Sequence, residues 1–363
     1  MTPDGTLTTL VLFDGTNGNS PSSILQANDG NFYGTTRGNT IGLGNLPTHW
    51  GAVFKMTPDG TLSTLSLFNS TNGSAPGSLL QGSDRNFYGT TDLGGAYGFG
   101  TVFKISSDGV LTTVVSFNDT NASGPYSLMQ ASDGNFYGTM FRGGKRTVYS
   151  ANRGTYSDYL GTVFRLSPDG TLTNLVLFNR SNGAGPLGAL VEGTDGNFYV
   201  ATWQGGLVGA PGTFGALPAG LGMVLKMTPQ GKVTTLFEFN GLNGLEPAAS
   251  LVQASDGSFY GTSSGGTNLT DSAEGIGTGE IFRLTVPGAD SPKIISTAQS
   301  GGRFSTTWLA LTRRSYQLQF ATNLAQTNWS NTGGRITATN STASALDTVV
   351  ADRQRFYRVV LSP

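Results

Sequence analysis

The side chains best suited to acid–base chemistry lie in segments that the sequence predicts to be loops. Cleavage of a glycosidic bond needs two carboxylates, or a carboxylate and a second base, at a defined separation. His49 is the only histidine and therefore the only imidazole base. No recognisable catalytic motif surrounds these residues. If the protein is an enzyme, its catalytic candidates are Asp92, Asp158, Glu246, Asp271, Glu274 and His49.

Aromatic and basic side chains in the same predicted loops could bind a ligand. Aromatic rings offer apolar faces on which sugar rings stack, and a basic cluster could attract an acidic polysaccharide. The alternatives are that the rings pack the loops onto the fold and that the basic cluster is solvated. The ligand-binding candidates are Trp50, Tyr97, Arg142, Arg146, Tyr149, Tyr156 and Trp203.

Asparagine or aspartate recurs at one position before each predicted first strand and could form a ring of oxygen ligands. Calcium prefers such ligands. The favoured alternative is turn formation, because these side chains cap their own backbone and tolerate left-handed geometry. We therefore predict no cofactor and leave calcium as the open alternative. Its candidate ligands are Asp14, Asn69, Asn118, Asn179 and Asn240.

Composition excludes several classes of protein. The chain has no cysteine, which excludes disulfides, thiolate nucleophiles and cysteine-based metal centres. A formal net charge of −1 over 363 residues gives no bulk attraction to nucleic acid. No apolar run approaches the ~18–20 residues of a membrane-spanning helix. The first residues, "MTPDGTLTTL", do not resemble a leader peptide.

One octapeptide is repeated along the chain and indicates the architecture. "DGNFYGTT" at 29–36 has close copies at 84–91, 133–140, 195–202 and 256–263. In each unit we predict four short strands, typified by "SSILQ", "NFYGT", "GAVFK" and "TLSTLSLF", because these runs are rich in β-formers and bounded by turn residues. Asp-Gly pairs between the first two strands and the last two favour tight hairpins.

The adjacent Phe-Tyr pair in each second strand predicts a sheet buried on both faces. Neighbouring residues on a strand point to opposite faces, so Phe32 and Tyr33 need apolar cover on each side. A four-stranded unit of ~50–60 residues with two covered faces is the size of a propeller blade.

The strand count predicts a closed ring. The fifth unit lacks a fourth strand, and the chain begins with an orphan one, "TLTTLVLF" at 6–13. We predict a five-bladed β-propeller over residues 1–286, closed when this N-terminal strand completes the fifth blade. The short hairpin turns then share one end, the turn end. The longer connections share the other, the loop end, where a ligand site is expected.

Residues 287–363 lack the repeat. They alternate apolar and polar positions, most clearly in "SYQLQFATN" at 315–323 and "QRFYRVVLS" at 354–362. Short alternating strands over about 75 residues predict a small C-terminal β-sandwich of immunoglobulin or fibronectin type.

The repeat "DGNFYGTT…GTVFK…TPDGTLTTL" resembles the Gloeo_Verruco (GloVer) tandem repeat of choice-of-anchor bacterial surface proteins, over about residues 1–284. The ending "YQLQFATNL…RFYRVV" is similar to a terminal domain of secreted proteins from the same bacteria. More distantly, the blade pattern is similar to NHL-type propellers. The resemblance implies a secreted or cell-surface protein, and it supplies no catalytic motif.

We expect an extracellular binding or scaffold protein that contacts a glycan or another surface partner through the loop end. The near-identity of the units favours this hypothesis. The alternative is a carbohydrate-active enzyme, a polysaccharide lyase or glycoside hydrolase, with its site at the same end. Neither nucleic acid nor a membrane span is expected.

Overall fold

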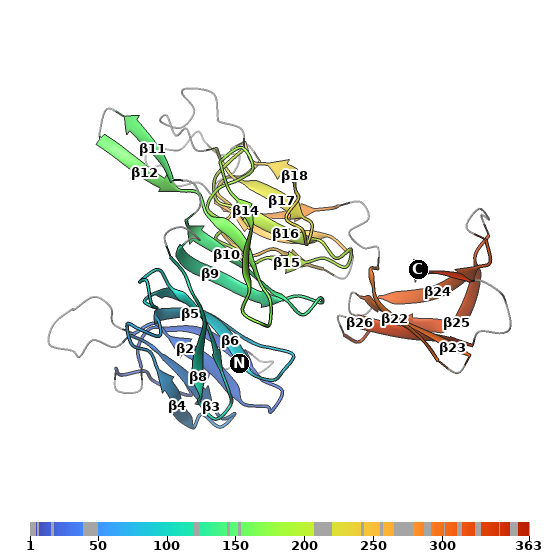
Figure 1. The fold of residues 1–363 in the computed structure, drawn as a ribbon, viewed down its shortest axis with the longest axis horizontal. Coiled ribbons are helices and arrows are strands. Elements are labelled where there is room, and N and C mark those ends of the chain that lie inside the picture. Colours follow the sequence, from blue (N-terminus) through green and yellow to red (C-terminus); the bar gives the residue numbers. More distant parts are fainter. Residues whose placement is uncertain are drawn as a thin grey trace.

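A computed structural model gives an all-β fold of four- and three-stranded antiparallel sheets and one two-stranded hairpin (Figure 1). It describes residues 5, 7–15, 18–38, 50–118, 123–143, 146–151, 154–206, 220–240, 243–254, 257–264, 279–286, 292–300, 302–310, 314–323, 328–340, 342–348 and 355–362. Within this part of the chain, no helix is long and apolar enough to cross a membrane.

Each of the first four units forms a four-stranded sheet in the predicted strand order. The strands are β1 (Pro21–Gln26), β2 (Phe32–Thr36), β3 (Ala52–Met56) and β4 (Leu62–Leu67); β5 (Ser74–Gln81), β6 (Phe87–Leu93), β7 (Thr101–Ile105) and β8 (Leu111–Ser116); β9 (Ser123–Gln130), β10 (Phe136–Arg142), β13 (Thr162–Leu166) and β14 (Leu172–Leu177); β15 (Val191–Glu192), β16 (Phe198–Thr202), β17 (Met223–Met227) and β18 (Val233–Glu238).

The third and fifth units depart from this pattern. Between its second and third strands the third unit carries an extra hairpin, β11 (Arg146–Ala151) with β12 (Gly154–Tyr159), which projects from the sheets (Figure 1). In the described residues the fifth sheet has three strands, β19 (Val252–Gln253), β20 (Phe259–Ser263) and β21 (Glu280–Leu284).

The Asp-Gly pairs form tight turns as predicted. Gly30 has a φ of 81°, a left-handed conformation that glycine adopts without strain. Its N–H donates to the carbonyl of Ala27 at 2.9 Å, and the N–H of Ala27 donates to the carbonyl of Asn31. The connection between β1 and β2 is therefore fixed within five residues, which sets the register of the hairpin.

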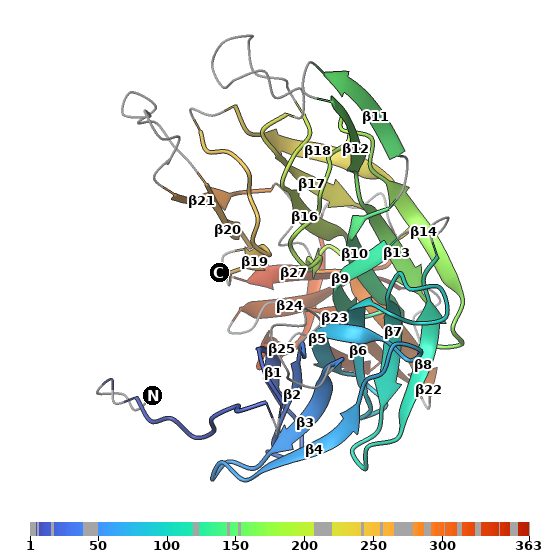
Figure 2. The same ribbon diagram turned by 90° about the vertical axis from the view of Figure 1, so that its left-hand side faces the viewer.

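The repeat sheets follow one another along an arc, with their first strands on the inner side (Figure 2). Neighbouring sheets contact each other through both faces, as the Phe-Tyr pairs predicted. Tyr33 is fully buried and stacks on Phe87 of the next sheet with ring centroids 4.0 Å apart. The stack recurs between each later pair of sheets, in Tyr88–Phe136, Tyr137–Phe198 and Tyr199–Phe259.

Among the described residues, the N-terminal segment lies apart from the fifth sheet, and the predicted pairing with that sheet is not formed. Residues 7–15 lie in no strand, and within the described part of the chain β21 pairs only with β20. The segment contacts the first sheet, where Phe13 packs on Phe54 with ring centroids 5.4 Å apart. The arc therefore stays open between the first and fifth sheets (Figure 2).

The C-terminal residues form two further sheets around a common core. The strands are β22 (Ile294–Ser300), β23 (Arg303–Leu309) and β26 (Thr342–Thr348) in one sheet, and β25 (Ser330–Thr337), β24 (Ser315–Ala321) and β27 (Phe356–Ser362) in the other. Trp308 and Tyr316, both fully buried, meet in this core at a ring distance of 5.8 Å. The two strands predicted most clearly from the sequence are β24 and β27.

Candidate functional site

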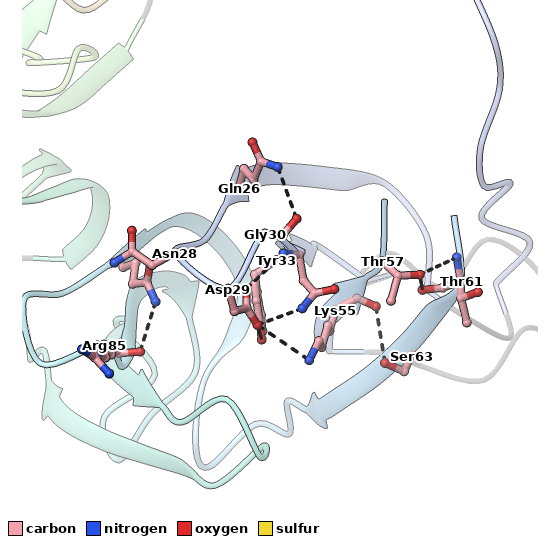
Figure 3. A network of polar contacts seen from close by, with 12 residues as sticks. Gln26, Asn28, Asp29, Gly30, Tyr33, Lys55, Thr57, Thr61, Ser63 and Arg85 are labelled. Carbon is pink, nitrogen blue, oxygen red and sulfur yellow. Dashed lines mark hydrogen bonds and ion pairs between the residues drawn. The ribbon is translucent and has the colours of Figure 1, made fainter. Parts of the chain in front are cut away.

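The turn end carries the same polar network in successive sheets. In the first, the Asp29 carboxylate accepts hydrogen bonds from the Asn31 side chain and from the Tyr33 hydroxyl, each at 2.9 Å, and pairs with Lys55 (Figure 3). Burial, together with the bond to Asp29, raises the pKa of Tyr33 to about 12. The tyrosine therefore stays a neutral donor inside the sheet.

Near-identical networks surround Asp84, Asp133 and Asp195. The ion pairs with Lys104 and Lys226 are shorter than the first, at 2.9 and 2.8 Å. Burial would raise the pKa of Asp84, but hydrogen bonds from Lys104, Asn86 and Tyr88 outweigh it and lower the pKa to about 2. Because these networks repeat with the blades, we assign them to building the fold.

Side chains also join neighbouring sheets at the turn end. The Gln81 side-chain oxygen accepts a hydrogen bond from the backbone N–H of Asn28 in the preceding sheet at 3.0 Å. The bond recurs along the arc in Gln130 to Ser83, Glu192 to Ser132 and Gln253 to Thr194. This end of the molecule is thus repetitive in its interactions between sheets as well as within them.

The recurring asparagines of the loop end shape turns. The Asn69 side-chain oxygen accepts from the backbone N–H groups of Thr71 and Asn72, and the Asn72 side-chain oxygen accepts from the N–H of Asn69 at 2.8 Å. Matching bonds occur in the pairs Asn179–Asn182 and Asn240–Asn243. Asp14 and Asn118 occupy the equivalent positions of their units.

These bonds support the turn interpretation over calcium ligation at the asparagines they involve, since the oxygens already face their own backbone. Within the described ranges, no group of three or more His, Cys, Asp or Glu could hold a metal ion.

A strained backbone position recurs where each connection enters the next first strand. The residue before each strand-opening proline has a left-handed φ, 51° at both Ala75 and Glu246. The N–H of Ala75 donates to the carbonyl of Trp50 in the preceding sheet at 2.9 Å, and that of Glu246 donates to Leu221 at 2.8 Å. The catalytic candidate Glu246 is therefore placed by a contact that the other units share.

One position at the loop end changes chemical class from unit to unit, although it directly follows the repeated octapeptide. The residue directly after the second-strand motif is Arg37 in the first unit and Asp92 in the second. In the third and fourth units it is Phe141 and Trp203, whose rings lie 6.4 Å apart. The fifth unit has Ser264. Equivalent positions thus carry a cation, an anion, two aromatic rings and a hydroxyl.

Arg37 and Asp92 form an ion pair across the first and second sheets. The Arg37 Nη2 to Asp92 Oδ2 distance is 3.3 Å, and the side chains are 47% and 49% exposed. An exposed pair with one long contact contributes little to stability. The fold therefore depends little on this pair.

The ion pair borders a pocket of about 480 Å³, a volume within the ~300–1,000 Å³ range of small-molecule sites. The pocket is lined by the inner strands and by the ends of the second strands: Ser22, Ser23, Arg37, Ala75, Gly77, Ser78, Asp92, Gly124, Pro125, Tyr126 and Phe141. Its lining residues come from the first three sheets, so the pocket forms only when these sheets stack against one another.

The remaining candidate residues lie in different parts of the structure. Trp50 is half-buried and packs against the core between the first two sheets, which supports the packing alternative for this residue. Tyr97 is 61% exposed. Arg142 ends β10, and Arg146, Tyr149, Tyr156 and Asp158 lie on the β11–β12 hairpin, where Tyr149 pairs with Tyr156 in the register. His49, Asp271 and Glu274 lie outside the described residues.

Sequence reasoning missed Arg37, Gly77, Tyr126 and Phe141 as members of one pocket. A signal was present: aligning the units on the octapeptide shows that the residue after it changes chemical class from unit to unit. What the alignment could not show is that these positions face one pocket.

Residues 1–156 match a family model described as the Gloeobacter/Verrucomicrobia repeat. This part of the chain belongs to the Gloeobacter/Verrucomicrobia repeat family. The resemblance seen in the repeats is confirmed over these residues. No curated protein sequence matches the chain significantly.

Solved structures with some likeness include three enzymes. The periplasmic gluconolactonase of Pseudomonas aeruginosa is 15% identical over 93% of this chain and 94% of that chain, with a TM-score of 0.44. A gluconolactonase of Xanthomonas campestris is 13% identical over 80% and 83%, at 0.42. A luciferin-regenerating enzyme is 15% identical over 74% and 78%, at 0.44. At TM-scores this low, these likenesses carry no conclusion about the activity of the repeat protein.

Proposed function

We propose that this protein is an extracellular or cell-surface binding protein that contacts a glycan through its loop end. The observation that supports this most is the change of chemical class directly after the octapeptide motif, at Arg37, Asp92, Phe141 and Trp203, in units whose strand motifs are nearly copies. Repeated positions suffice to build blades, so chemical variety at this loop-end position points to a partner.

We also propose that the propeller is a closed ring of five blades over residues 1–286. Two side chains at the gap between the first and fifth sheets, here called the seam, support this. Ile281 is 82% exposed, whereas the equivalent Val53 and Val102 are fully buried. Ile24 is 59% exposed, whereas the equivalent Leu79 is 8% exposed. Closure would bury both isoleucines, and each such burial stabilises by roughly 1.5–3 kcal/mol.

The contacts between sheets leave complementary halves at the seam. At each interface between consecutive sheets, a tyrosine stacks on the phenylalanine of the next sheet. The equivalent residues at the seam are Tyr260 in the fifth sheet and Phe32 in the first, and both are half-buried. The residues before β1 already pack on the first sheet through Phe13 and Phe54, as Phe68 packs on Phe103 of its next sheet. Pairing of residues 7–12 with β21 would complete the fifth blade.

The strand pairing within the other blades shows which two residues would face each other at the seam, and a disulfide between them tests closure. Lys55 is opposite Ser63 in the first sheet, and the corresponding pair at the seam is Arg283 and Thr8. Because the chain lacks cysteine, the two introduced thiols of the double variant Thr8→Cys with Arg283→Cys are the only ones that can form a disulfide. We expect oxidation to give a crosslinked monomer, as in the matched control Ser63→Cys with Lys55→Cys. A free thiol pair or a crosslinked dimer would contradict closure within one chain.

We interpret residues 287–363 as a β-sandwich domain that leaves the loop end uncovered. Its two sheets share one core. Its contact with the repeat sheets is at the turn end, where the N–H of Lys293 donates to the carbonyl of Thr194 at 2.9 Å. The domain is therefore placed to attach the propeller with its loop end facing outward.

The binding function is tested by an array of plant, algal and bacterial glycans, with reducing-sugar release measured on each glycan retained. We expect retention without turnover, reduced by Trp203→Ala. Turnover that is abolished by Asp92→Asn would favour the carbohydrate-active enzyme instead. Failure to retain any glycan would contradict the proposed function.

A further inference from the structure

The lining of the pocket beside the ion pair includes a position at which one blade lacks a side chain. Gly77 follows the strand-opening proline of the second sheet, where the first sheet has Ser22 and the third has Tyr126. A Cβ placed on Gly77 would meet only the Thr90 hydroxyl, at 3.5 Å. Gly77 is not held in a left-handed conformation. Glycine is therefore not required there by the backbone, and its effect is to leave a hollow between its neighbours.

The rim of this hollow places hydrogen-bond donors beside acceptors. Arg37 offers five N–H donors in a planar fork, and Asp92 offers about four lone-pair sites. Their mutual contact uses one Nη2 and one Oδ2, 3.3 Å apart, and both side chains are half-exposed. Most of this capacity faces the solvent beside the pocket.

Part of the pocket lining is aromatic. Tyr126 is 52% exposed at the pocket. Phe141 is a second lining residue, and Trp203 lies next to it. Apolar side chains that gather at one pocket are a feature of ligand-binding grooves. An apolar face next to a polar edge matches a sugar ring, whose C–H groups lie on its faces and whose hydroxyls lie around its edge.

The charges also select among sugars. Two adjacent hydroxyls each donate and accept, so one can accept from the Arg37 guanidinium while its neighbour donates to Asp92. A sugar carboxylate could pair with Arg37 but would be repelled by Asp92 at the same site. The ion pair is neutral as a unit, and it complements a neutral diol better than an anion.

We propose that this pocket binds a neutral saccharide through two adjacent hydroxyls held by Arg37 and Asp92, with the sugar face against Tyr126. This rests on the proposed glycan-binding function and adds the ligand class and the location. Acidic glycans, which the basic residues of the third unit could attract, are the class that the pocket excludes.

The test compares neutral with acidic probes on the full chain. Xylo-, cello- and laminari-oligosaccharides are the neutral probes, and oligogalacturonate and alginate oligomers are the acidic ones. We expect at least one neutral series to bind and the acidic ones to bind about tenfold or more weakly. Gly77→Tyr should weaken neutral binding by about tenfold or more, because the new ring fills the hollow.

Matched variants keep the result interpretable. Tyr126 shows that a blade accepts tyrosine at this position, so Gly77→Tyr should fold, with an unchanged thermal transition. Leu187→Tyr introduces the same side chain after the proline of the fourth unit, away from the pocket, and should leave affinity within about twofold. Asp92→Asn should shift preference toward oligogalacturonate, because it leaves the Arg37 charge unbalanced.

Two results would overturn the inference while leaving glycan binding intact. One is an acidic glycan bound more tightly than every neutral probe. The other is neutral binding that Gly77→Tyr, Arg37→Gln and Asp92→Asn all leave unchanged. Absence of binding to any glycan would overturn the proposed function together with this inference.

Discussion

The two ends of the repeat sheets are built from the same units but differ in what they repeat. At the turn end, Asp29, Asp84, Asp133 and Asp195 each bind the tyrosine of their own hairpin. At the loop end, the position after the second strand changes from Arg37 to Asp92 to Phe141. A sequence repeated for stability keeps its chemistry in every unit, and a position freed from that role can vary for recognition.

Exposure follows the same division. The turn-end tyrosines are nearly or fully buried, as Tyr137 and Tyr199 show. The loop-end pair of Arg37 and Asp92 is about half exposed. Substitutions at the turn end should therefore act on folding, and substitutions at the loop end should act on binding.

The largest difference is expected from removing a turn-end ring. Tyr199→Ala removes a fully buried side chain stacked 4.0 Å from Phe259 and bonded to Asp195, and it should lower the free energy of unfolding by about 3–5 kcal/mol. The loop-end counterpart Tyr97→Ala removes a side chain that is 61% exposed and should change it by less than about 0.5 kcal/mol. Urea denaturation measures both; equal losses would contradict the division.

A smaller difference is expected from the carboxylates. Asp195 accepts from Asn197, Tyr199 and Lys226 with its side chain 10% exposed, so Asp195→Asn should cost about 2–3 kcal/mol. Asp92→Asn, at an exposed pair, should cost less than about 1 kcal/mol. If Asp92→Asn proved the more damaging in the same denaturation experiment, the ion pair would have to be reassigned to the fold.

The smallest expected effect is a pH dependence specific to the turn end. The Asp84 pKa is lowered to about 2 in the folded protein, below its ordinary value of 3.8. A carboxyl whose pKa is depressed by folding stabilises the protein above its unfolded pKa, and that contribution disappears as the pH falls through the folded value. Stability should therefore decline between about pH 4 and pH 2, and Asp84→Asn should flatten part of that decline in thermal melts. An unchanged slope in the variant would show that Asp84 does not contribute to it.

The sequence predicted the parts of the fold that depend on neighbours along the chain. Asp29-Gly30 fixes a hairpin within five residues, and the adjacent Phe32 and Tyr33 require cover on both faces of a sheet. The pocket could not be predicted in this way. Arg37 and Asp92 are 55 residues apart, and they meet only because consecutive sheets stack in a fixed register. The role of Gly77 could not be predicted either, because the effect of a missing side chain depends on which residues surround it in the fold.

Two residues of the loop end lie in different surroundings for physical reasons. Asn69 has a local role, and turn chemistry anticipated its bonds to Thr71 and Asn72. Trp50 was proposed as a ligand platform, and the structure packs it against the core between the first two sheets. A loop aromatic next to a strand can reach the core, and sequence alone does not distinguish this from exposure.

The most direct test of the central claim is titration calorimetry with a neutral oligosaccharide retained on the array, applied to one variant from each end. For the double variant Arg37→Gln with Asp92→Asn, the account predicts a loss of affinity of about tenfold or more with an unchanged unfolding transition. For Asp84→Asn at the turn end, it predicts unchanged affinity with lower stability. Binding that is lost in the turn-end variant and kept in the loop-end variant would contradict the account.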